Sequence, residues 1–350
     1  MARILLISAN NHCVPYPVYP IGLAYISTYL KEKMPESELR LFDVNKGNSS
    51  DLEALINKFQ PQYTGISFRN IDDANSMNKE SFIEDYRNLV NQIRLLSDSI
   101  IIAGGAGFSL FAEVLYKELQ PDYGVYGEGE ASLVSLIKSL ETGGNPNTIP
   151  GLVFADKEKV VVNRDRNQYS DLRLNFDDQL IDYYWDKSGM LNIQTKRGCP
   201  HSCIYCSYPV IEGTKVRNLN PDKIVQTLVH LYRDKKVNYV FFTDSVFNLG
   251  KSYNRELAEK IIETGIHMKW GAYFSPKDLD VETLSLFKKA GLKHIEFGTE
   301  SMSNAVLKSY NKHFTVKDVL DVSENCNVAG VYFAHFLILG GYGETNETVQ

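Results

Sequence analysis

Three of the five cysteines fall within eight residues, in the stretch TKRGCPHSCIYCSYP (195–209). Cys199, Cys203 and Cys206 are spaced CxxxCxxC and follow the run LNIQTKRG (191–198), which predicts a strand. Thiolate is the ligand of iron–sulfur clusters, so three thiolates on one loop can hold three corners of a four-iron cluster and leave the fourth iron open. Two alternatives are a zinc site completed by His201 and buried cysteines without a ligand, although structural zinc sites usually combine two separated ligand pairs.

Strands and helices alternate after this loop. Further apolar runs predict strands at 237–245, 268–275, 294–301 and 331–341, and the stretches between them have helical periodicity. Together with the strand before the cysteines, this series predicts part of a (β/α) barrel, which carries its functional side chains at the carboxyl ends of the strands. The sequence stops in what reads as the first turn of another helix, so we expect a partial barrel that is truncated at its C-terminus.

The first half of the chain alternates in the same way. Five short apolar runs, several of them rich in β-branched residues, predict a doubly wound parallel sheet that binds its ligand beyond the carboxyl ends of the strands. A loop and a small predicted hairpin follow. We therefore expect an α/β protein with domains at 1–145 and 189–350, joined by a linker with a hairpin at 146–188.

Composition narrows the class of protein. The chain has 350 residues, of which 37 are basic and 43 acidic, for a net charge of −6. This balance gives no cationic field for a nucleic-acid backbone or an anionic membrane, so we expect neither as a partner. No apolar run reaches the ~18 residues that a membrane span needs. The cysteines lack the even spread of a secreted disulfide framework, so we expect a cytoplasmic protein.

The motif RGCPHSCIYC resembles the CxxxCxΦC signature of the radical S-adenosylmethionine (SAM) superfamily, with Tyr205 at the aromatic position. The resemblance implies a partial (β/α)6 barrel and a [4Fe-4S] cluster on Cys199, Cys203 and Cys206. Its open iron is chelated by SAM, which is cleaved reductively to a 5′-deoxyadenosyl radical. Tyr205 and Ser207 are then expected beside SAM.

The resemblance also implies roles for residues at the ends of later strands. Asp244, in VFFTDSVFN, is expected near the SAM amino group, and Glu300, in FGTES, near the ribose hydroxyls. Gly340 and Gly341, in FLILGGYGET, are expected beside adenine. The alternative for a polar residue such as Asp244 is a cap on the helix that follows.

The first half resembles the cobalamin-binding Rossmann-like domain that precedes many radical SAM modules. The resemblance rests on GISFRN and IAGGAG, with further likeness in YPIGLAYISTYL and YGEGEASLVSL. It implies that cobalamin contacts residues after three strands: Ser67, Phe68, Arg69, Asn70, Gly104, Gly105, Gly127 and Glu128. For the two consecutive glycines at 104 and 105, the alternative is tight packing of strand against helix.

One departure concerns the cobalt ligand. The family's DxHxxG element is reduced here to Asn10, His12 and Pro15, so a histidine ligand to cobalt is not expected. Arg69 could occupy the lower face of the corrin without coordinating the metal, because a guanidinium has no lone pair to give. The alternative for Arg69 is a surface salt bridge with a nearby aspartate.

Together the two parts resemble the cobalamin-dependent radical SAM enzymes. The resemblance implies transfer of a methyl group from SAM, through methylcobalamin, to an unactivated carbon or phosphorus of a peptide, lipid or natural product. It also implies an electron donor such as flavodoxin or ferredoxin. Alternatives are cyclisation or rearrangement without net methylation, a first domain that no longer binds corrinoid, and a non-enzymatic iron–sulfur or zinc protein.

Overall fold

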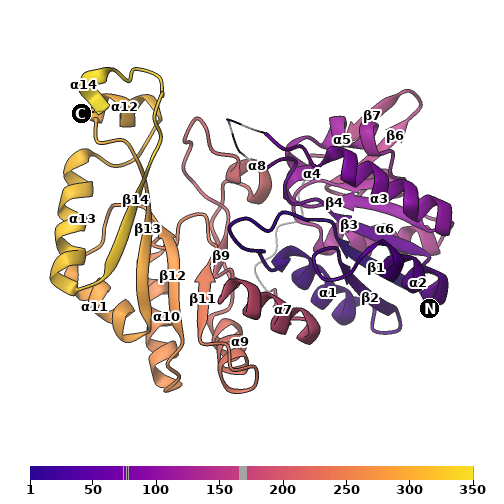
Figure 1. Ribbon diagram of the computed structural model, residues 1–350, viewed down its shortest axis with the longest axis horizontal. Helices are drawn as coiled ribbons and strands as arrows, with labels where there is room; N and C mark the ends of the chain where they lie inside the picture. The colour runs from indigo at the N-terminus through magenta and orange to yellow at the C-terminus, as the bar shows by residue number, and fades with distance from the viewer. Residues whose placement is uncertain (74, 76, 78, 165–171, 350) are drawn as a thin grey trace. The chain divides into compact units, whose positions relative to one another are not determined.

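The computed structural model describes residues 1–73, 75, 77, 79–164 and 172–349 (Figure 1). The described chain divides into two compact units, the first running up to Asp177 and the second from Asp178 onward, with Leu172 assigned to the second. The domain bounds 1–145, 146–188 and 189–350 stay a prediction. Among the described residues, no helix is long and apolar enough to cross a bilayer.

The first unit is built on a sheet of order β2-β1-β3-β4-β5-β6-β7. The pairs from β2 to β5 are parallel, whereas β6 pairs antiparallel with both β5 and β7, so the expected hairpin extends this sheet. The strands are β1 (Arg3–Ser8), β2 (Glu38–Asp43), β3 (Tyr63–Ser67), β4 (Ile100–Gly104), β5 (Tyr123–Val125), β6 (Leu152–Asp156) and β7 (Lys159–Val162).

Helices cover both faces of this sheet (Figure 1). Alternation along β1 sends Ile4 and Leu6 into one core, and Leu5 and Ile7 into the other. The first core is closed by α1 (Ile21–Lys33) and α6 (Glu130–Glu141); the second is closed by α2 (Ser49–Phe59), α3 (Ile83–Leu96) and α5 (Ala112–Leu119), and the short α4 (Ala106–Leu110) follows β4. This is the predicted doubly wound fold, in which strand order reverses between β1 and β3.

The second unit contains a parallel sheet of order β14-β13-β12-β11-β8, which matches the predicted partial barrel. Its strands are β8 (Leu191–Ile193), β11 (Tyr239–Phe242), β12 (Lys269–Phe274), β13 (Leu292–Glu300) and β14 (Tyr332–Leu337). Its helices are α7 (Asp178–Ser188), α8 (Tyr208–Glu212), α9 (Pro221–Arg233), α10 (Lys251–Glu263), α11 (Val281–Lys289), α12 (Asn304–Ser309), α13 (Val316–Ala329) and α14 (Asn346–Val349). Aromatic rings in contact, such as Phe242, Phe247 and Trp270, form a buried cluster in this unit.

The predicted strand 191–198 is wrong in one respect, because the structure divides it. β8 ends at Ile193, and β9 (Lys196–Arg197) pairs antiparallel with β10 (Arg217–Asn218). The backbone amides of Thr195 and Lys196 donate to the carboxylate of Asp244 instead of to a neighbouring strand. The chain therefore leaves the parallel sheet before it reaches the cysteines.

Candidate functional site

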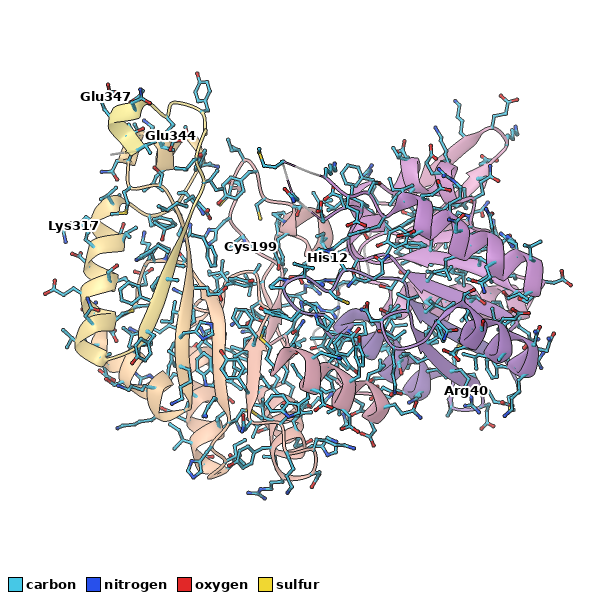
Figure 2. All side chains as sticks on the ribbon, viewed as in Figure 1. His12, Arg40, Cys199, Lys317, Glu344 and Glu347 are labelled. Carbon is cyan, nitrogen blue, oxygen red and sulfur yellow. The ribbon has the colours of Figure 1, made fainter. Side chains whose placement is uncertain are left out.

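The three cysteines lie on the loop between β9 and α8, where Figure 2 labels Cys199. All are free thiols; Cys199 is buried, and Cys203 and Cys206 are half-buried. The amide of Cys199 donates to the carbonyl of Gly213 at 3.1 Å, and that of Cys206 donates to the carbonyl of Cys203 at 3.1 Å. These bonds turn the loop back on itself and bring the sulfurs near enough for the cysteines to influence one another's pKa.

Gly198 makes the turn into this loop. Its φ of +85° lies in the left-handed region, and a Cβ there would come 2.2 Å from the carbonyl oxygen of Lys215. Only glycine fits such a position. The buried carboxylate of Glu212 secures it, accepting from the Gly198 amide at 3.0 Å and from Nε2 of Gln194 at 2.7 Å. Burial raises the pKa of Glu212, and Arg197 acts in the opposite direction.

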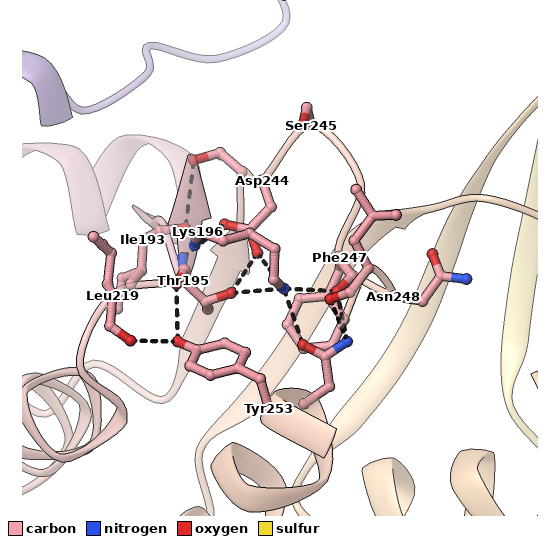
Figure 3. A network of polar contacts seen from close by, with 12 residues as sticks. Ile193, Thr195, Lys196, Leu219, Asp244, Ser245, Phe247, Asn248 and Tyr253 are labelled. Atoms are coloured by element: carbon pink, nitrogen blue, oxygen red, sulfur yellow. Dashed lines mark hydrogen bonds and ion pairs between the residues drawn. The ribbon is translucent and has the colours of Figure 1, made fainter. Parts of the chain in front are cut away.

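A buried polar network fixes the segment just before the loop (Figure 3). Nζ of Lys196 lies 3.2 Å from Oδ2 of Asp244, 2.9 Å from Oδ1 of Asn254 and 2.7 Å from the carbonyl oxygen of Phe247. Tyr253 completes the network with a hydroxyl that donates to the carbonyl of Thr195 at 2.8 Å. The cysteine loop is thereby tied to the loop after β11 and to α10.

This network fixes the position of Asp244, one of the predicted catalytic residues. Its side chain is fully buried, and its carboxylate accepts from Lys196 and from both the amide and the hydroxyl of Thr195. With its oxygens engaged in this way, Asp244 is suited to hold the start of the loop. Direct contact with SAM stays a prediction.

The cysteine sulfurs lie near enough to one another to interact electrostatically. Burial raises the pKa of Cys199 and of Cys203, and the other cysteines raise it further, because neighbouring thiolates repel each other. Bound iron would offset that repulsion. Within the described residues, no three His, Cys, Asp or Glu side chains converge as around one metal ion. The ring of His201, the fourth candidate ligand of the zinc alternative, stacks on His313, and its Nε2 is buried without a hydrogen-bond partner.

Tyr205 and Glu300 are brought together. The Tyr205 hydroxyl donates to Oε1 of Glu300 at 2.8 Å, and Nζ of Lys312 lies 3.0 Å from the same oxygen. Glu300 has φ of +67° at an irregularity in the pairing of β13 with β14, an unusual conformation for a residue other than glycine. Ser207 lies at the start of α8, where its carbonyl accepts from the amide of Val210 at 2.9 Å.

The two glycines after β14 differ in their surroundings. A Cβ on Gly341 would come 1.5 Å from the hydroxyl oxygen of Tyr310, whereas a Cβ on Gly340 would meet nothing within 4 Å. Gly341 is therefore required by packing, whereas Gly340 is exposed and has a φ of +83°, which favours glycine. Their contact with adenine stays a prediction.

The predicted cobalamin residues meet at the carboxyl ends of β3 and β4. The Phe68 amide donates to the carbonyl of Gly104 at 2.8 Å. The Phe68 side chain is fully buried in the core, so only its backbone is available at this edge. A Cβ on Gly105, whose φ is +98°, would come 2.6 Å from the Phe68 carbonyl oxygen, which supports the packing alternative for this glycine. At Gly104 the nearest atom is 3.8 Å away.

The edge between β1 and β3 suits a ligand with amide groups. Asn10 lies just beyond β1 and is 4% exposed, and its Oδ1 has no hydrogen-bond partner. Ala9, beside it, donates to the carbonyl of Ser67 at the end of β3, 3.1 Å away. A buried acceptor without a donor is costly, so a donor from a bound molecule would satisfy it. The side-chain amides of a corrinoid are donors of this kind.

The remaining predicted cobalamin residues flank this edge. Arg69 is exposed, and the carbonyl of Asn70 accepts from the hydroxyl of Tyr86. Gly127 donates through its amide to Oγ of Ser109 at 2.9 Å. Glu128 is half-buried. Their contact with cobalamin stays a prediction.

Lys196 and Glu212 were not predicted from the sequence. Each contacts residues on other elements, so neither carries a local signal that separates it from a surface charge. The position of Lys196, three residues before the first cysteine, is the one hint that it acts on the loop.

Each of the two units contains a stretch that matches the model of a known protein family. Residues 7–137 match the family model of the B12 binding domain, and residues 193–350 match that of the radical SAM superfamily. An uncharacterized methyltransferase of Pyrococcus horikoshii is 24% identical over 95% of this chain and 71% of its own length. The anaerobic magnesium-protoporphyrin IX monomethyl ester cyclase of Synechocystis sp. is 31% identical over 62% of this chain, but over only 45% of its own length.

A solved structure has the same fold. The radical SAM methyltransferase TsrM from Kitasatospora setae, with tryptophan and a SAM analogue bound, matches with a TM-score of 0.89 at 23% identity, over 100% of this chain and 70% of that chain. The chain therefore combines a B12-binding domain at 7–137 with a radical SAM domain at 193–350, which is the composition of the cobalamin-dependent radical SAM enzymes.

Proposed function

We propose that this protein is a cobalamin-dependent radical SAM methyltransferase that acts on an unactivated carbon or phosphorus of a small molecule, peptide, lipid or natural-product intermediate. The observation that carries the proposal is the cysteine loop, with its three thiols grouped on one loop after β9, in the same chain as a doubly wound sheet. The methyltransferase relatives support methyl transfer over other radical chemistry.

The residues divide into holding and positioning roles. Cys199, Cys203 and Cys206 would hold a [4Fe-4S] cluster, with Glu300 and the open side of Gly340 toward SAM. In the first unit, the backbone at 67–70, 104–105 and 127–128 and the orphaned oxygen of Asn10 would face cobalamin. When bound, the cluster supplies the electron that cleaves SAM, and cobalamin carries the methyl group. The protein holds the reacting groups in line and excludes water.

A second candidate is ring formation or rearrangement without net methylation. It is favoured by the 31% identity to the cyclase of Synechocystis sp.. The two reactions differ in product mass, because methylation adds one methylene unit per turnover and cyclisation does not.

Anaerobic reconstitution with iron, sulfide and hydroxocobalamin tests both cofactors. We expect a brown chromophore with about four irons per chain, a corrinoid absorption band, and 5′-deoxyadenosine once SAM and a strong reductant are added. Stoichiometric zinc with no chromophore would contradict the proposal. A cluster without a corrinoid band would restrict it to a radical SAM enzyme with a scaffold domain.

The reaction also needs an electron donor and a reducing compartment. We infer a flavodoxin or ferredoxin as donor and a cytoplasmic location, supported by the chemistry of the cluster and by the free thiols at all five cysteines.

A further inference from the structure

The turn after α12, Tyr310–His313, contacts the cysteine loop at several positions. The carbonyl of Tyr310 accepts from the amide of Ile204 at 3.2 Å, and the Tyr310 ring packs edge-on against Tyr205, with centroids 5.6 Å apart. Both contacted residues lie between the second and third cysteines. We call Tyr310–His313 the loop clamp.

Asn311 holds the part of the loop between the first and second cysteines. Its Nδ2 donates to the carbonyl oxygen of Ser202 at 3.0 Å and lies 2.6 Å from Oγ of the same residue. Asn311 has φ of +59°, in the left-handed region that asparagine tolerates better than most residues. The turn and its side-chain bonds thus depend on the same residue.

His313 contacts the same part of the loop through a stacked ring. Its imidazole is 3.6 Å from that of His201, with 6° between the planes. His313 is itself anchored, because its Nε2 is 2.8 Å from Oγ of Ser275 and its carbonyl accepts from Nζ of Lys277 at 3.0 Å. The stack therefore links the loop to a fixed point at the end of β12.

Lys312 adds a nearly buried positive charge. Its side chain is 7% exposed, and its Nζ lies 3.0 Å from Oε1 of Glu300, 3.2 Å from the carbonyl oxygen of Gly298 and 5.3 Å from the centroid of Tyr205. Lys312 is thus held against Tyr205 of the cysteine loop by its contacts with Glu300 and Gly298.

We propose that the loop clamp holds the cysteine loop in its cluster-binding shape, with Asn311 and Lys312 as its main positioning residues. Three thiolates repel each other, and an unrestrained loop would have to be ordered at the moment of cluster binding. Contacts along the loop provide that order in advance. A reduced cluster carries one more negative charge than an oxidised one, so the Lys312 ammonium favours the reduced form. This last effect rests on the proposed function; the ordering of the loop does not.

Hydrogen exchange on the full, cluster-free chain tests the clamp directly. The variants are Asn311→Gly, Ser202→Ala, Lys312→Met, Lys312→Arg and, as control, Lys308→Met, which alters an exposed lysine of α12. Glycine at position 311 keeps access to the left-handed conformation and removes only the side chain. We expect amide exchange at 200–206 to rise several-fold in Asn311→Gly and Lys312→Met, to be largely restored in Lys312→Arg, and to be unchanged in Lys308→Met.

Unchanged exchange at 200–206 in both Asn311→Gly and Lys312→Met would overturn the clamp. If Asn311→Gly does not fold, the exchange measured in Ser202→Ala takes its place. This change removes the Ser202 hydroxyl, one of the two groups that the Asn311 side chain contacts. On the reconstituted protein, we expect faster iron loss to a chelator in Asn311→Gly and a more negative cluster midpoint potential in Lys312→Met than in Lys312→Arg. A chain that takes up no cluster would defeat the proposed function, while the exchange measurement would still decide the clamp.

Discussion

Nζ of Lys196 lies 3.2 Å from Oδ2 of Asp244, and the two side chains are only 1% and 0% exposed. Burial lowers the pKa of Lys196, and the carboxylate of Asp244 opposes that shift. Removing one partner of such a pair leaves an uncompensated buried charge, which costs about 3–5 kcal/mol. The pair thus couples the segment before the cysteines to the loop after β11.

Lys196→Met should therefore lower the free energy of unfolding by a few kcal/mol, measured by urea titration. The double variant Lys196→Met/Asp244→Asn should lose less than the sum of the single losses, because the second change removes the stranded charge. Lys317→Met is the control, since its pair with Asp321 is 81% and 56% exposed and such a solvated ion pair contributes little to stability. Additive losses would show that the two groups do not interact.

Cys203→Ala should abolish cluster assembly, because two thiolates cannot hold the cluster in place of three. The measurement is iron content after anaerobic reconstitution, together with 5′-deoxyadenosine formation. Cys13→Ala is the matched control: Cys13 is exposed, and its thiol is 3.2 Å from Oδ1 of Asn45, away from the other cysteines in sequence. Full iron binding by Cys203→Ala would remove this cysteine from the ligand set.

Gly104→Ala and Gly105→Ala should separate a ligand contact from backbone packing. Gly105→Ala is expected to lower the unfolding free energy by about 1–3 kcal/mol, since its φ is +98° and its Cβ would meet the Phe68 carbonyl. Gly104→Ala should be tolerated, because its Cβ would meet no atom closer than 3.8 Å. Loss of the corrinoid band in a stable Gly104→Ala protein would place that residue against the cofactor. An unchanged band would show that a Cβ at position 104 does not meet the cofactor.

His313 should make the unfolding free energy depend on pH. Burial lowers its pKa to about 4, and His201, Lys277 and Lys312 add to the shift while Asp318 opposes it. Between about pH 6.5 and 4 the unfolded chain binds a proton at this ring that the folded chain does not, so stability falls as pH drops through this window. His313→Phe should show a shallower fall in urea titrations over that range. Identical slopes for both proteins would exclude His313 as a source.

Much of the fold follows from local patterns. Short apolar runs that alternate with stretches of helical periodicity predict a parallel sheet in each half of the chain, and the structure has both. The division of 191–198 into two strands did not follow, because it is caused by Asp244, more than forty residues further along the chain. The cysteine motif could be predicted because its three residues lie close together in the sequence, on one loop.

The residues that hold the loop were beyond sequence reasoning. A lysine in isolation is expected at the surface, and only the tertiary fold places Asn254 and Phe247 around Lys196. Asn311 bonds to Ser202 across 109 positions of sequence, which no periodicity describes. Side chains that contact the chemistry-bearing loop from a distance therefore need coordinates to be found.

The hairpin of β6 and β7 has a consequence for solubility. A long parallel sheet that ended on an open apolar strand would present unpaired amides and carbonyls to other molecules, a template for aggregation. Here the edge of the sheet is instead β7, a four-residue strand, KVVV, that begins with an exposed lysine. Such a short edge strand with an exposed lysine discourages a second copy from adding its own strand, so deleting the hairpin should expose the edge of β5 and increase aggregation.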